Sequence, residues 1–416
     1  MGRVSEVAEG LWSGTLGPDQ HHPWFALHEL EELDRGVAFV SSFANVAAFD
    51  TDDGLVLVDT GSFLLAGQIH AAIRGWSSRP LHTAVFTHGH VDHVFGVGPF
   101  EEEARTAGWR RPHVVAHEDL PARFDRYRTT AGWNACINAR QFRMPNLRWP
   151  TEYRYPDEVY HATHTVTVGG LRLELVHARG ETDDHTWVWV PDRRVLCTGD
   201  LFIWASPNAG NPQKVQRYPH DWARALRAMQ TLDAELLLPG HGYPIRGAAR
   251  IRQALGETAE LLEFLHDRTL EMMNAGATLE EIVHAVVPPP ALLARPYLQP
   301  VYDEPEFVVR NVWRLYGGWW DGDPAHLKPA PTSALGAEVA ALAGGADRLA
   351  ARALELAAKD ELALACDLVE LAARGAPDDP EIRRARARIY RQRAGTERSV
   401  MARGVYDAAA ARDEDA

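Results

Sequence analysis

The chain has 416 residues, and at roughly 150 residues per domain this length allows two or three domains. With 46% hydrophobic and 24% charged residues, the composition is that of a folded globular protein and excludes an intrinsically disordered one. Acidic residues outnumber basic ones by 57 to 43, and the resulting formal net charge of −14 argues against a protein that binds nucleic acid by neutralising phosphates.

Short apolar runs alternate with amphipathic ones between about residues 35 and 250. The apolar runs predict strands at 37–40, 45–49, 55–58, 84–86, 113–116, 171–176, 186–190, 195–197 and 235–238. Apolar residues at helical spacing predict helices at 64–76 and 222–232, between some of these strands. The pattern is typical of an α/β fold with many strands at short spacing.

Strand signals disappear after about residue 250, and helical patterns take their place. Apolar residues at helical spacing predict a helix over 251–274, and an aromatic and apolar segment at 307–320 follows a proline-rich connector. Further Ala-rich and Leu-rich helices are expected at 346–358, 360–374 and 379–392, joined by short turns that resemble tetratricopeptide-like hairpins. We therefore expect two domains, an α/β domain over 1–250 and an all-helical domain over 251–416.

Cysteine usage and the absence of long apolar runs set the expected compartment. Cys136, Cys197 and Cys366 lie far apart without CxxC spacing, which favours neither a disulfide framework nor a thiolate zinc site. The first ten residues lack the apolar core of a secretory signal, and no run of eighteen apolar residues follows. We expect a cytoplasmic protein with neither a membrane nor a nucleic-acid partner.

Three histidines and an aspartate stand within six residues, directly after the strand expected at 84–86. The run is Thr87-His88-Gly89-His90-Val91-Asp92-His93. So many imidazole and carboxylate groups are costly to hold together in a protein unless a cation binds them. A pair of metal ions accounts for all four, because His88 and His90 can point to one ion while Asp92 and His93 point to a second. This ligand chemistry suits zinc first, and also iron or manganese.

A two-metal centre of this kind needs about six protein ligands, so further residues must complete it. Candidates follow three other predicted strands. They are Asp200 after the strand at 195–197, His241 after the strand at 235–238, and a residue of the segment that follows the strand at 171–176.

These motifs resemble those of the metallo-β-lactamase superfamily of metal-dependent hydrolases over roughly residues 10–250. The resemblance rests on four segments, His88-Gly-His90-Val-Asp92-His93, Val58-Asp59-Thr60-Gly61, Cys197-Thr-Gly-Asp200 and Pro239-Gly-His241-Gly242. It implies an αββα sandwich with the metals at one edge of the two sheets, followed here by the all-α helical domain.

The resemblance also implies a division of the ligands between two ions. These are His88, His90 and a residue of the 177–185 loop for the first metal, Asp92, His93 and His241 for the second, and Asp200 as a bridge between them. Asp59 would orient this site from behind the ligands.

One position narrows the resemblance to a branch of the superfamily. Most members carry a Pro-Gly-His-Thr-type sequence where this chain has Arg179-Gly180-Glu181-Thr182, so Glu181 stands in place of the histidine. A glutamate here resembles the alkylsulfatase branch, and the stretch 297–331 resembles that branch's dimerisation domain. His185 and His177 stay open as alternatives to Glu181, because neutral imidazole is the commoner zinc ligand.

The branch implies a two-zinc hydrolase of alkyl or related sulfate esters that forms a homodimer through its helical domain. Two ions would activate a bridging water as hydroxide, with Asp200 holding the pair and Asp92 orienting the nucleophile. The sequence does not choose between S–O and C–O cleavage. An anionic sulfate needs further donors, for which we expect Arg217, with Asn138 and Asn208.

Two other functions stay open at this stage. The branch commonly has glutamate followed by asparagine where this chain has Asp200-Leu201, so the small-molecule substrate could be a lactone, thioester, phosphodiester or β-lactam instead. A helical-repeat interaction protein with a non-catalytic sandwich is the third possibility. The complete set of ligands argues against it.

Overall fold

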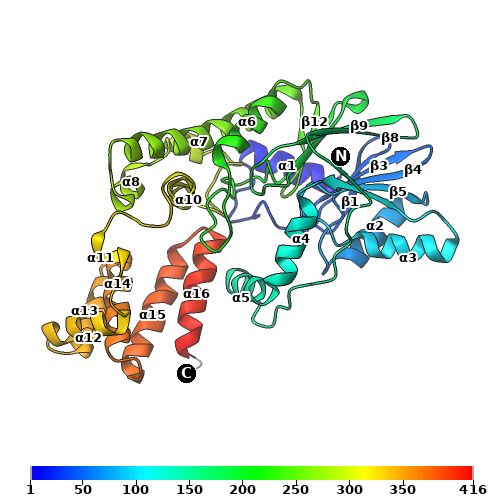
Figure 1. Ribbon diagram of the computed structural model, residues 1–416. Helices are drawn as coiled ribbons and strands as arrows, with labels where there is room; N and C mark the ends of the chain where they lie inside the picture. Colours follow the sequence, from blue (N-terminus) through cyan, green and yellow to red (C-terminus); the bar gives the residue numbers. More distant parts are fainter. Residues whose placement is uncertain (1, 415–416) are drawn as a thin grey trace. The chain divides into compact units, whose positions relative to one another are not determined.

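The computed structural model describes residues 2–414 and divides into two compact units (Figure 1). The first unit holds residues up to Ala131 together with Trp149–Ala277 and Glu281–Tyr316. The second unit holds Gly132–Arg148, Thr278–Glu280 and the residues from Gly317 on. All strands of the described chain belong to the first unit.

A seven-stranded sheet forms one half of the first unit. Its strands stand in chain order, β1 (Leu30–Asp34), β2 (Val37–Val40), β3 (Val46–Thr51), β4 (Gly54–Val58), β5 (Leu81–Val85), β6 (His113–His117) and β7 (Glu158–Tyr160). Pairs from β1 to β4 are antiparallel, and pairs from β4 to β7 are parallel. The parallel strands β4 and β5 therefore end at the same edge of the sheet.

A six-stranded sheet forms the other half, in the order β13-β12-β11-β10-β9-β8. Its strands are β8 (Thr163–Val168), β9 (Leu171–His177), β10 (Thr186–Val190), β11 (Val195–Gly199), β12 (Leu236–Pro239) and β13 (Ile245–Arg246). Only β11 and β12 pair in parallel. The ladder between them shifts register between Cys197 and Gly199, just before the chain leaves β11.

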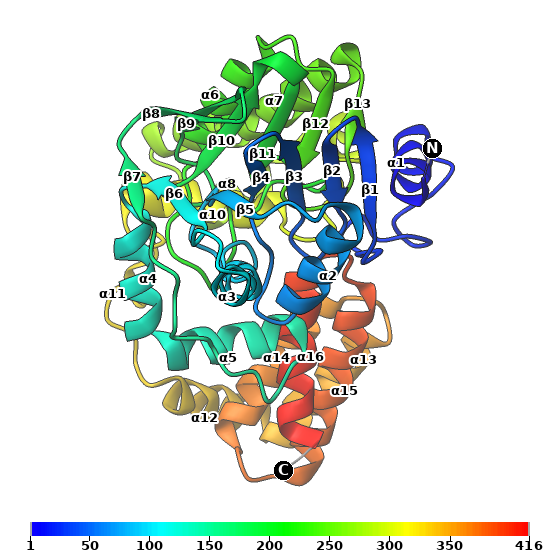
Figure 2. The same cartoon turned by 90° about the vertical axis from the view of Figure 1, so that its right-hand side faces the viewer.

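Helices cover the outer faces of both sheets (Figure 2). The helices of this unit are α1 (Arg3–Ser13), α2 (Ala66–Trp76), α3 (Val97–Ala107), α4 (Leu120–Thr129), α6 (Pro219–Gln230), α7 (Ala248–Asn274), most of α8 (Leu279–Ala285), α9 (Pro290–Leu293) and α10 (Pro305–Gly317). Every residue of β2, β4, β10, β11 and β12 is buried, so each of these strands has both faces covered. The expected αββα sandwich is confirmed.

Packing of α2 on the first sheet shows how the sequence builds this layer. Ile69 and Ile73 stand four residues apart on one face of α2 and are buried. They join a core cluster with Leu55 and Leu57, which alternate along β4 and so point to the same side of the sheet.

Within residues 2–414, all regular secondary structure of the second unit is helical. It contains α5 (Ala131–Phe142), α11 (Pro324–Leu327), α12 (Thr332–Ala343), α13 (Ala346–Ala357), α14 (Leu362–Gly375), α15 (Pro380–Thr396) and α16 (Val400–Glu414). Small and aliphatic side chains such as Ala353, Leu356 and Val369 form its core. The expected helical region after the sandwich is confirmed, and the three helices expected at 346–392 are present.

The division by packing does not fall at residue 250, where the sequence places it. Helix α7 belongs to the first unit because its face with Ile251, Leu255 and Leu262 is buried, and α7 packs along α6. Helix α5 comes from the middle of the α/β sequence but belongs to the helical unit, where Arg143 just beyond it pairs with Asp407 of α16 at 3.0 Å.

The α2 layer gives a stability prediction. We expect Leu57→Ala to lower the free energy of unfolding by about 2–5 kcal/mol, because Leu57 is fully buried in the cluster with Ile69 and Ile73 and its loss leaves a cavity. Leu64→Ala is the matched control, since Leu64 is 61% exposed and its removal should change stability by about 0.5 kcal/mol or less. Urea unfolding of the three proteins measures both effects, and equal midpoints would contradict the packing described for this layer.

Candidate metal centre

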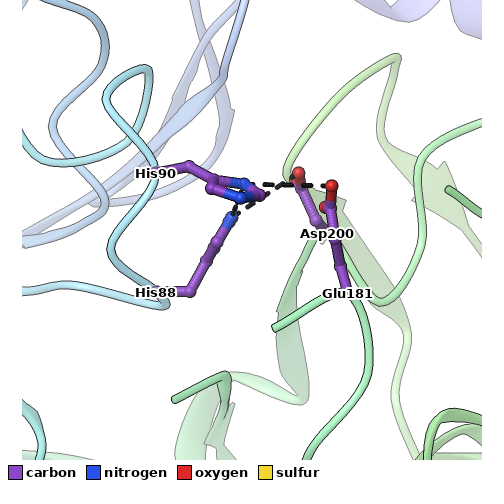
Figure 3. Close-up of side chains that lie close together, drawn as sticks. All are labelled: His88, His90, Glu181 and Asp200. Atoms are coloured by element: carbon purple, nitrogen blue, oxygen red, sulfur yellow. Dashed lines mark hydrogen bonds and ion pairs between the residues drawn. The ribbon is translucent and has the colours of Figure 1, made fainter. Parts of the chain in front are cut away.

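The residues expected as metal ligands lie on loops that follow strands of both sheets. His88 and His90 follow β5 of the first sheet, whereas Glu181 follows β9, and Asp200 directly follows β11, in the second. Figure 3 shows the two histidines and the two acids approaching one another from opposite sides. The edge of the sandwich therefore gathers side chains that are far apart in the sequence.

The first group of possible ligands consists of His88, His90, Glu181 and Asp200. Each offers one nitrogen or oxygen atom, and these atoms all lie within 4.8 Å of one another. His88 Nε2 lies 2.8 Å from His90 Nδ1 and 3.7 Å from Asp200 Oδ2, while His90 Nδ1 lies 3.9 Å from Glu181 Oε1. Two imidazole nitrogens and two carboxylates at this spacing form a donor set that suits zinc.

The second group consists of Asp92, His93 and His241, whose ligand atoms also lie within 4.8 Å of one another. His241 Nε2 is 3.5 Å from Asp92 Oδ2, and His93 Nε2 is 3.8 Å from the same oxygen. Asp200 reaches this group too, because Oδ1 lies 3.4 Å from His93 Nε2 and Oδ2 lies 3.4 Å from His241 Nε2. Its carboxylate therefore faces both groups.

Several polar atoms at the centre are buried without a hydrogen-bond partner among the described residues. They are His93 Nε2, Glu181 Oε2 and Asp200 Oδ1. A buried polar atom without a partner is costly, and these three lie on side chains of the two groups. Divalent cations bound by the groups would satisfy them, so the residues present fit a metal centre.

The histidines of the first group are held in the neutral form that binds metals. Burial lowers the pKa of His88 well below its usual value, and His93 and His90 lower it further. Burial also lowers the pKa of His90, with Arg217 and Arg123 adding to the effect. Both imidazoles therefore keep a free lone pair at neutral pH.

In the second group, the pKa values of the histidines are raised instead of lowered. Burial lowers the pKa of His241, but Asp200 and Asp92 overcome this and raise it to about 10. The pKa of Asp200 is lowered well below its usual value, because His241 and His93 outweigh the effect of burial. In the absence of a metal, protons on the imidazoles balance the carboxylates, and a bound metal would release these protons.

Asp59 holds His93 from behind. Its Oδ2 atom accepts hydrogen bonds from His93 Nδ1 at 2.7 Å and from the Thr87 hydroxyl at 2.8 Å, and its Oδ1 accepts the Thr87 backbone N–H at 2.8 Å. A hydrogen bond at Nδ1 fixes the ring so that Nε2 points toward Asp200. The orienting role that the family resemblance implies for Asp59 stays a prediction, and this hydrogen bond shows through which ligand it would act.

His241 is fixed by a carbonyl and by an aromatic ring. Its Nδ1 donates to the Phe43 carbonyl oxygen at 2.5 Å, and its ring stacks on Trp24 with centroids 4.2 Å apart and planes 11° apart. Trp24 is held in turn by a hydrogen bond to the Ile203 carbonyl at 2.5 Å. Sequence reasoning missed Trp24, because nothing in its local sequence distinguishes it from an ordinary core aromatic residue.

Of the three alternatives for the third ligand of the first group, the structure brings Glu181 to His88 and His90. His185 Nε2 instead accepts the backbone N–H of Asp200 at 3.0 Å, and its ring stacks on His88 at 4.7 Å. His177 stacks on His117 at 3.7 Å and lies outside both groups.

The expected sulfate donors Arg217 and Asn208 both bind Glu181. Arg217 is buried and donates from Nη2 to Glu181 Oε1 at 3.1 Å and from Nη1 to the Glu181 carbonyl at 2.9 Å. Asn208 Nδ2 donates to the same Oε1. Asn138 lies in α5 of the second unit, where its Nδ2 donates to the Asn134 carbonyl at 2.8 Å.

Lys214, near Arg217 in the same loop, interacts electrostatically with the two ligand groups. Burial and the charge of Arg217 lower its pKa to about 7, while Asp92 and Glu181 act in the opposite direction. Its Nζ lies 5.6 Å from the ring centre of Trp149. Near neutral pH this lysine therefore changes between its charged and neutral forms, and the acids of the candidate centre favour the charged form.

A further group that could hold a metal joins α6 and α7. It consists of His220, His266 and Asp267, and His266 hydrogen-bonds both to Asp267 at 2.7 Å and to the Tyr316 hydroxyl at 3.0 Å. The sequence offers no local signal for this group, because its histidines stand on separate helices that meet only through packing.

Two family profiles match the chain. Residues 41–241 match the profile described as Metallo-beta-lactamase superfamily, and residues 278–415 match the profile described as Alkyl sulfatase dimerisation. No helix of the described residues is long and apolar enough to cross a membrane.

Characterised proteins and a solved structure resemble most of the chain. A linear primary-alkylsulfatase from Pseudomonas sp. is 27% identical over 82% of this chain and 69% of its own length. An (R)-specific secondary-alkylsulfatase from Pseudomonas sp. is 27% identical over 73% of this chain and 50% of its own length. The solved sec-alkylsulfatase Pisa1 from Pseudomonas sp. superimposes with a TM-score of 0.83 at 24% identity, over 93% of this chain and 66% of that one. This likeness shows the same fold.

Close backbone packing at Asp200 gives a prediction for the centre. A Cβ added at Gly240 would lie 2.1 Å from Asp200 Oδ1 and 2.7 Å from the backbone of Gly199, so Gly240→Ala must displace this carboxylate. We expect zinc affinity to fall by about tenfold or more, as happens when groups that orient ligands are disturbed. Gly67→Ala in α2 is the control, because nothing lies within 4 Å of the added atom. Competition with a chromophoric chelator measures the affinities, and an unchanged affinity in Gly240→Ala would contradict the placement of Asp200.

Proposed function

The chain belongs to the metallo-beta-lactamase superfamily, in the branch that also carries an alkyl sulfatase dimerisation domain, and we propose that it hydrolyses alkyl or related sulfate esters with two metal ions. The observation that carries this proposal is the carboxylate of Asp200, which faces two separate groups of ligand atoms. A shared carboxylate of this kind is what a two-metal hydrolase needs to hold its ions close together.

In this proposal each ligand group binds one ion, with zinc as the metal and iron or manganese also suited to the donors. The ligands are His88, His90 and Glu181 for the first ion, Asp92, His93 and His241 for the second, and Asp200 for both. Metals held by these residues would lower the pKa of bound water and so make hydroxide available at neutral pH.

The protein's own groups orient this chemistry. His185 holds the backbone of Asp200, and Asp59 holds the ring of His93, so both ligands are aimed before a metal binds. Asp92 is 21% exposed, more than the other acids of the centre, and we assign to it the orientation of the attacking water.

Positive charge beside the acids supports recognition of an anion. Arg217 uses both Nη atoms on Glu181, and its buried Nε has no hydrogen-bond partner in the part of the chain that is described. This Nε gives a sulfate group one charged donor to approach, and Lys214, whose pKa is lowered to about 7, adds a second group that can carry positive charge. Asn208 can contribute to sulfate recognition indirectly, because it donates a hydrogen bond to Glu181. A role for Asn138 in binding sulfate stays a prediction from the sequence.

The match to the dimerisation profile supports a homodimer formed through the helical region, which we also propose. A cytoplasmic location stays a prediction from the sequence alone.

Hydrolysis of a substrate panel tests the proposed function. The panel contains dodecyl sulfate, a secondary alkyl sulfate, a lactone, a thioester and a phosphodiester, assayed with protein whose metal content has been measured. We expect sulfate release from at least one sulfate ester, and loss of that release by about a hundredfold or more in a His90→Ala, Asp92→Ala variant that removes a ligand from each group.

His284→Ala is the matched control, because this histidine lies in α8, outside both ligand groups, and its removal should leave the rate within about twofold. Protein that holds two metals per chain, leaves both sulfates intact and cleaves another ester would keep the metal centre and reject the sulfatase assignment.

A further inference from the structure

A buried aspartate, Asp184, joins two loops that carry ligands of the candidate centre. It lies between Glu181 and His185 on the loop that follows β9 of the second sheet. Its Oδ2 atom accepts the backbone N–H of Gly89, the residue between His88 and His90 after β5 of the first sheet, at 2.8 Å. The hydrogen bond thus crosses from one sheet's loop to the other's beside the metal ligands.

Arg123 of α4 holds the other oxygen of this carboxylate. Its Nε donates to Asp184 Oδ1 at 2.7 Å, and its guanidinium also pairs with Asp183. Asp184 is fully buried and Arg123 is only 3% exposed, so this ion pair is shielded from water. Burial raises the pKa of Asp184, but Arg123 and the amide of Gly89 outweigh it, and the net pKa is lowered. The carboxylate is therefore charged at neutral pH.

The contact depends on the missing side chain at Gly89. A Cβ there would lie 2.7 Å from Arg123 Cδ and 3.2 Å from Asp184 Oδ2. The aliphatic part of the Arg123 side chain and the Asp184 carboxylate thus pack directly against the backbone that separates the two histidines of the first group. A glycine at this point of the motif lets Arg123 and Asp184 lie closer to the histidine loop than any other residue would allow.

We propose that Asp184 and Arg123 are positioning residues that fix the distance between the His88–His90 loop and Glu181, and so set the affinity for one of the two metals. The inference rests on the proposed metal centre and adds to it residues that contact no metal themselves. Asp184 acts through the backbone of Gly89 and through its neighbour His185, whose ring stacks on His88 of the first group. Moving this aspartate would disturb the first group more than the second.

A purely structural role of the ion pair makes a different prediction. Breaking a buried ion pair destabilises a protein wherever the pair lies, because one charge is left without its partner. Such a loss would lower the urea midpoint without selecting one metal over the other. A positioning role instead predicts a loss of binding affinity that is confined mainly to one of the two metals.

Asp184→Asn is the sharpest test, because it keeps the shape of the side chain and removes its charge. The amide has one oxygen to offer where the carboxylate offers two, so it can serve Gly89 or Arg123 but not both in the same way. Asp183→Asn is the matched control. Asp183 pairs with the same arginine, but its side chain is 40% exposed. Among the described residues, it is Asp184 whose side chain accepts the backbone N–H of Gly89.

Zinc affinities of the two ions are measured by competition with a chromophoric chelator, and zinc content by elemental analysis of the purified full chain. We expect Asp184→Asn to weaken one of the two ions by about ten- to hundredfold and to leave the other within about threefold. Asp183→Asn should leave both within about twofold. Arg123→Lys, which keeps the charge but loses the branched donor, should weaken the same ion as Asp184→Asn, by a smaller factor.

Equal zinc affinities in wild type and Asp184→Asn would overturn the proposal, as would equal losses at both ions accompanied by a lower urea midpoint of the metal-free protein. Failure of the sulfatase assignment looks different. In that case the wild type leaves sulfate esters intact while the selective loss of one zinc in Asp184→Asn is still observed. A wild type that binds no zinc would reject the metal centre and this inference together.

Discussion

The constraint on which the α/β unit depends is the burial of one carboxylate, Asp200, between two sets of imidazoles. Its oxygens lie 3.4 Å from His93 and His241 and 3.7 Å from His88, and the side chain is almost fully buried. A charge buried this deeply must be balanced by nearby positive charge. His93 and His241, whose pKa values are raised, supply this balance and follow strands of different sheets, so the two halves of the sandwich must end at a common edge. The fold therefore brings the ends of β5, β11 and β12 together at this point.

The backbone around Asp200 leaves little room for other arrangements. The ladder between β11 and β12 shifts register just before Asp200, and such irregularities redirect the side chain that follows them. Gly199 adopts a positive φ of 50°, and a Cβ there would lie 2.7 Å from the ring of His185, which receives the backbone N–H of Asp200. Local strand geometry, one glycine and one histidine thus jointly aim the shared carboxylate.

The sequence predicts the parts of this arrangement that are local. His88, His90, Asp92 and His93 are contiguous, and the αββα layers follow from apolar runs whose periods are visible in the chain. It could not reveal the pairing of Asp184 with Gly89, because that contact joins loops of different sheets and leaves no spacing pattern. Nor could it place α5 in the helical unit, because much of the sequence of the sandwich lies between this helix and the other helices of that unit. Short edge strands such as β7 and β13 were missed for another reason, because so few residues carry too little alternation to be recognised.

Glutamate in the position of a histidine has consequences for charge that reach beyond the ligand itself. With Glu181, Asp92 and Asp200 the two groups contain three carboxylates, whereas a histidine at 181 would leave two. The extra negative charge is met by Arg217 and Asn208, which both donate to Glu181, and by Lys214 through space. A neutral imidazole at 181 would remove the carboxylate that accepts from Nη2 of the buried Arg217 guanidinium and leave it only the backbone carbonyl of residue 181, at a cost in free energy. Glu181 and Arg217 therefore form one unit, in which Arg217 favours the charged form of this candidate ligand against burial and the charge of Asp200, which together raise its pKa. Substitution of Glu181 or Arg217 alone would remove the charged partner of the other residue.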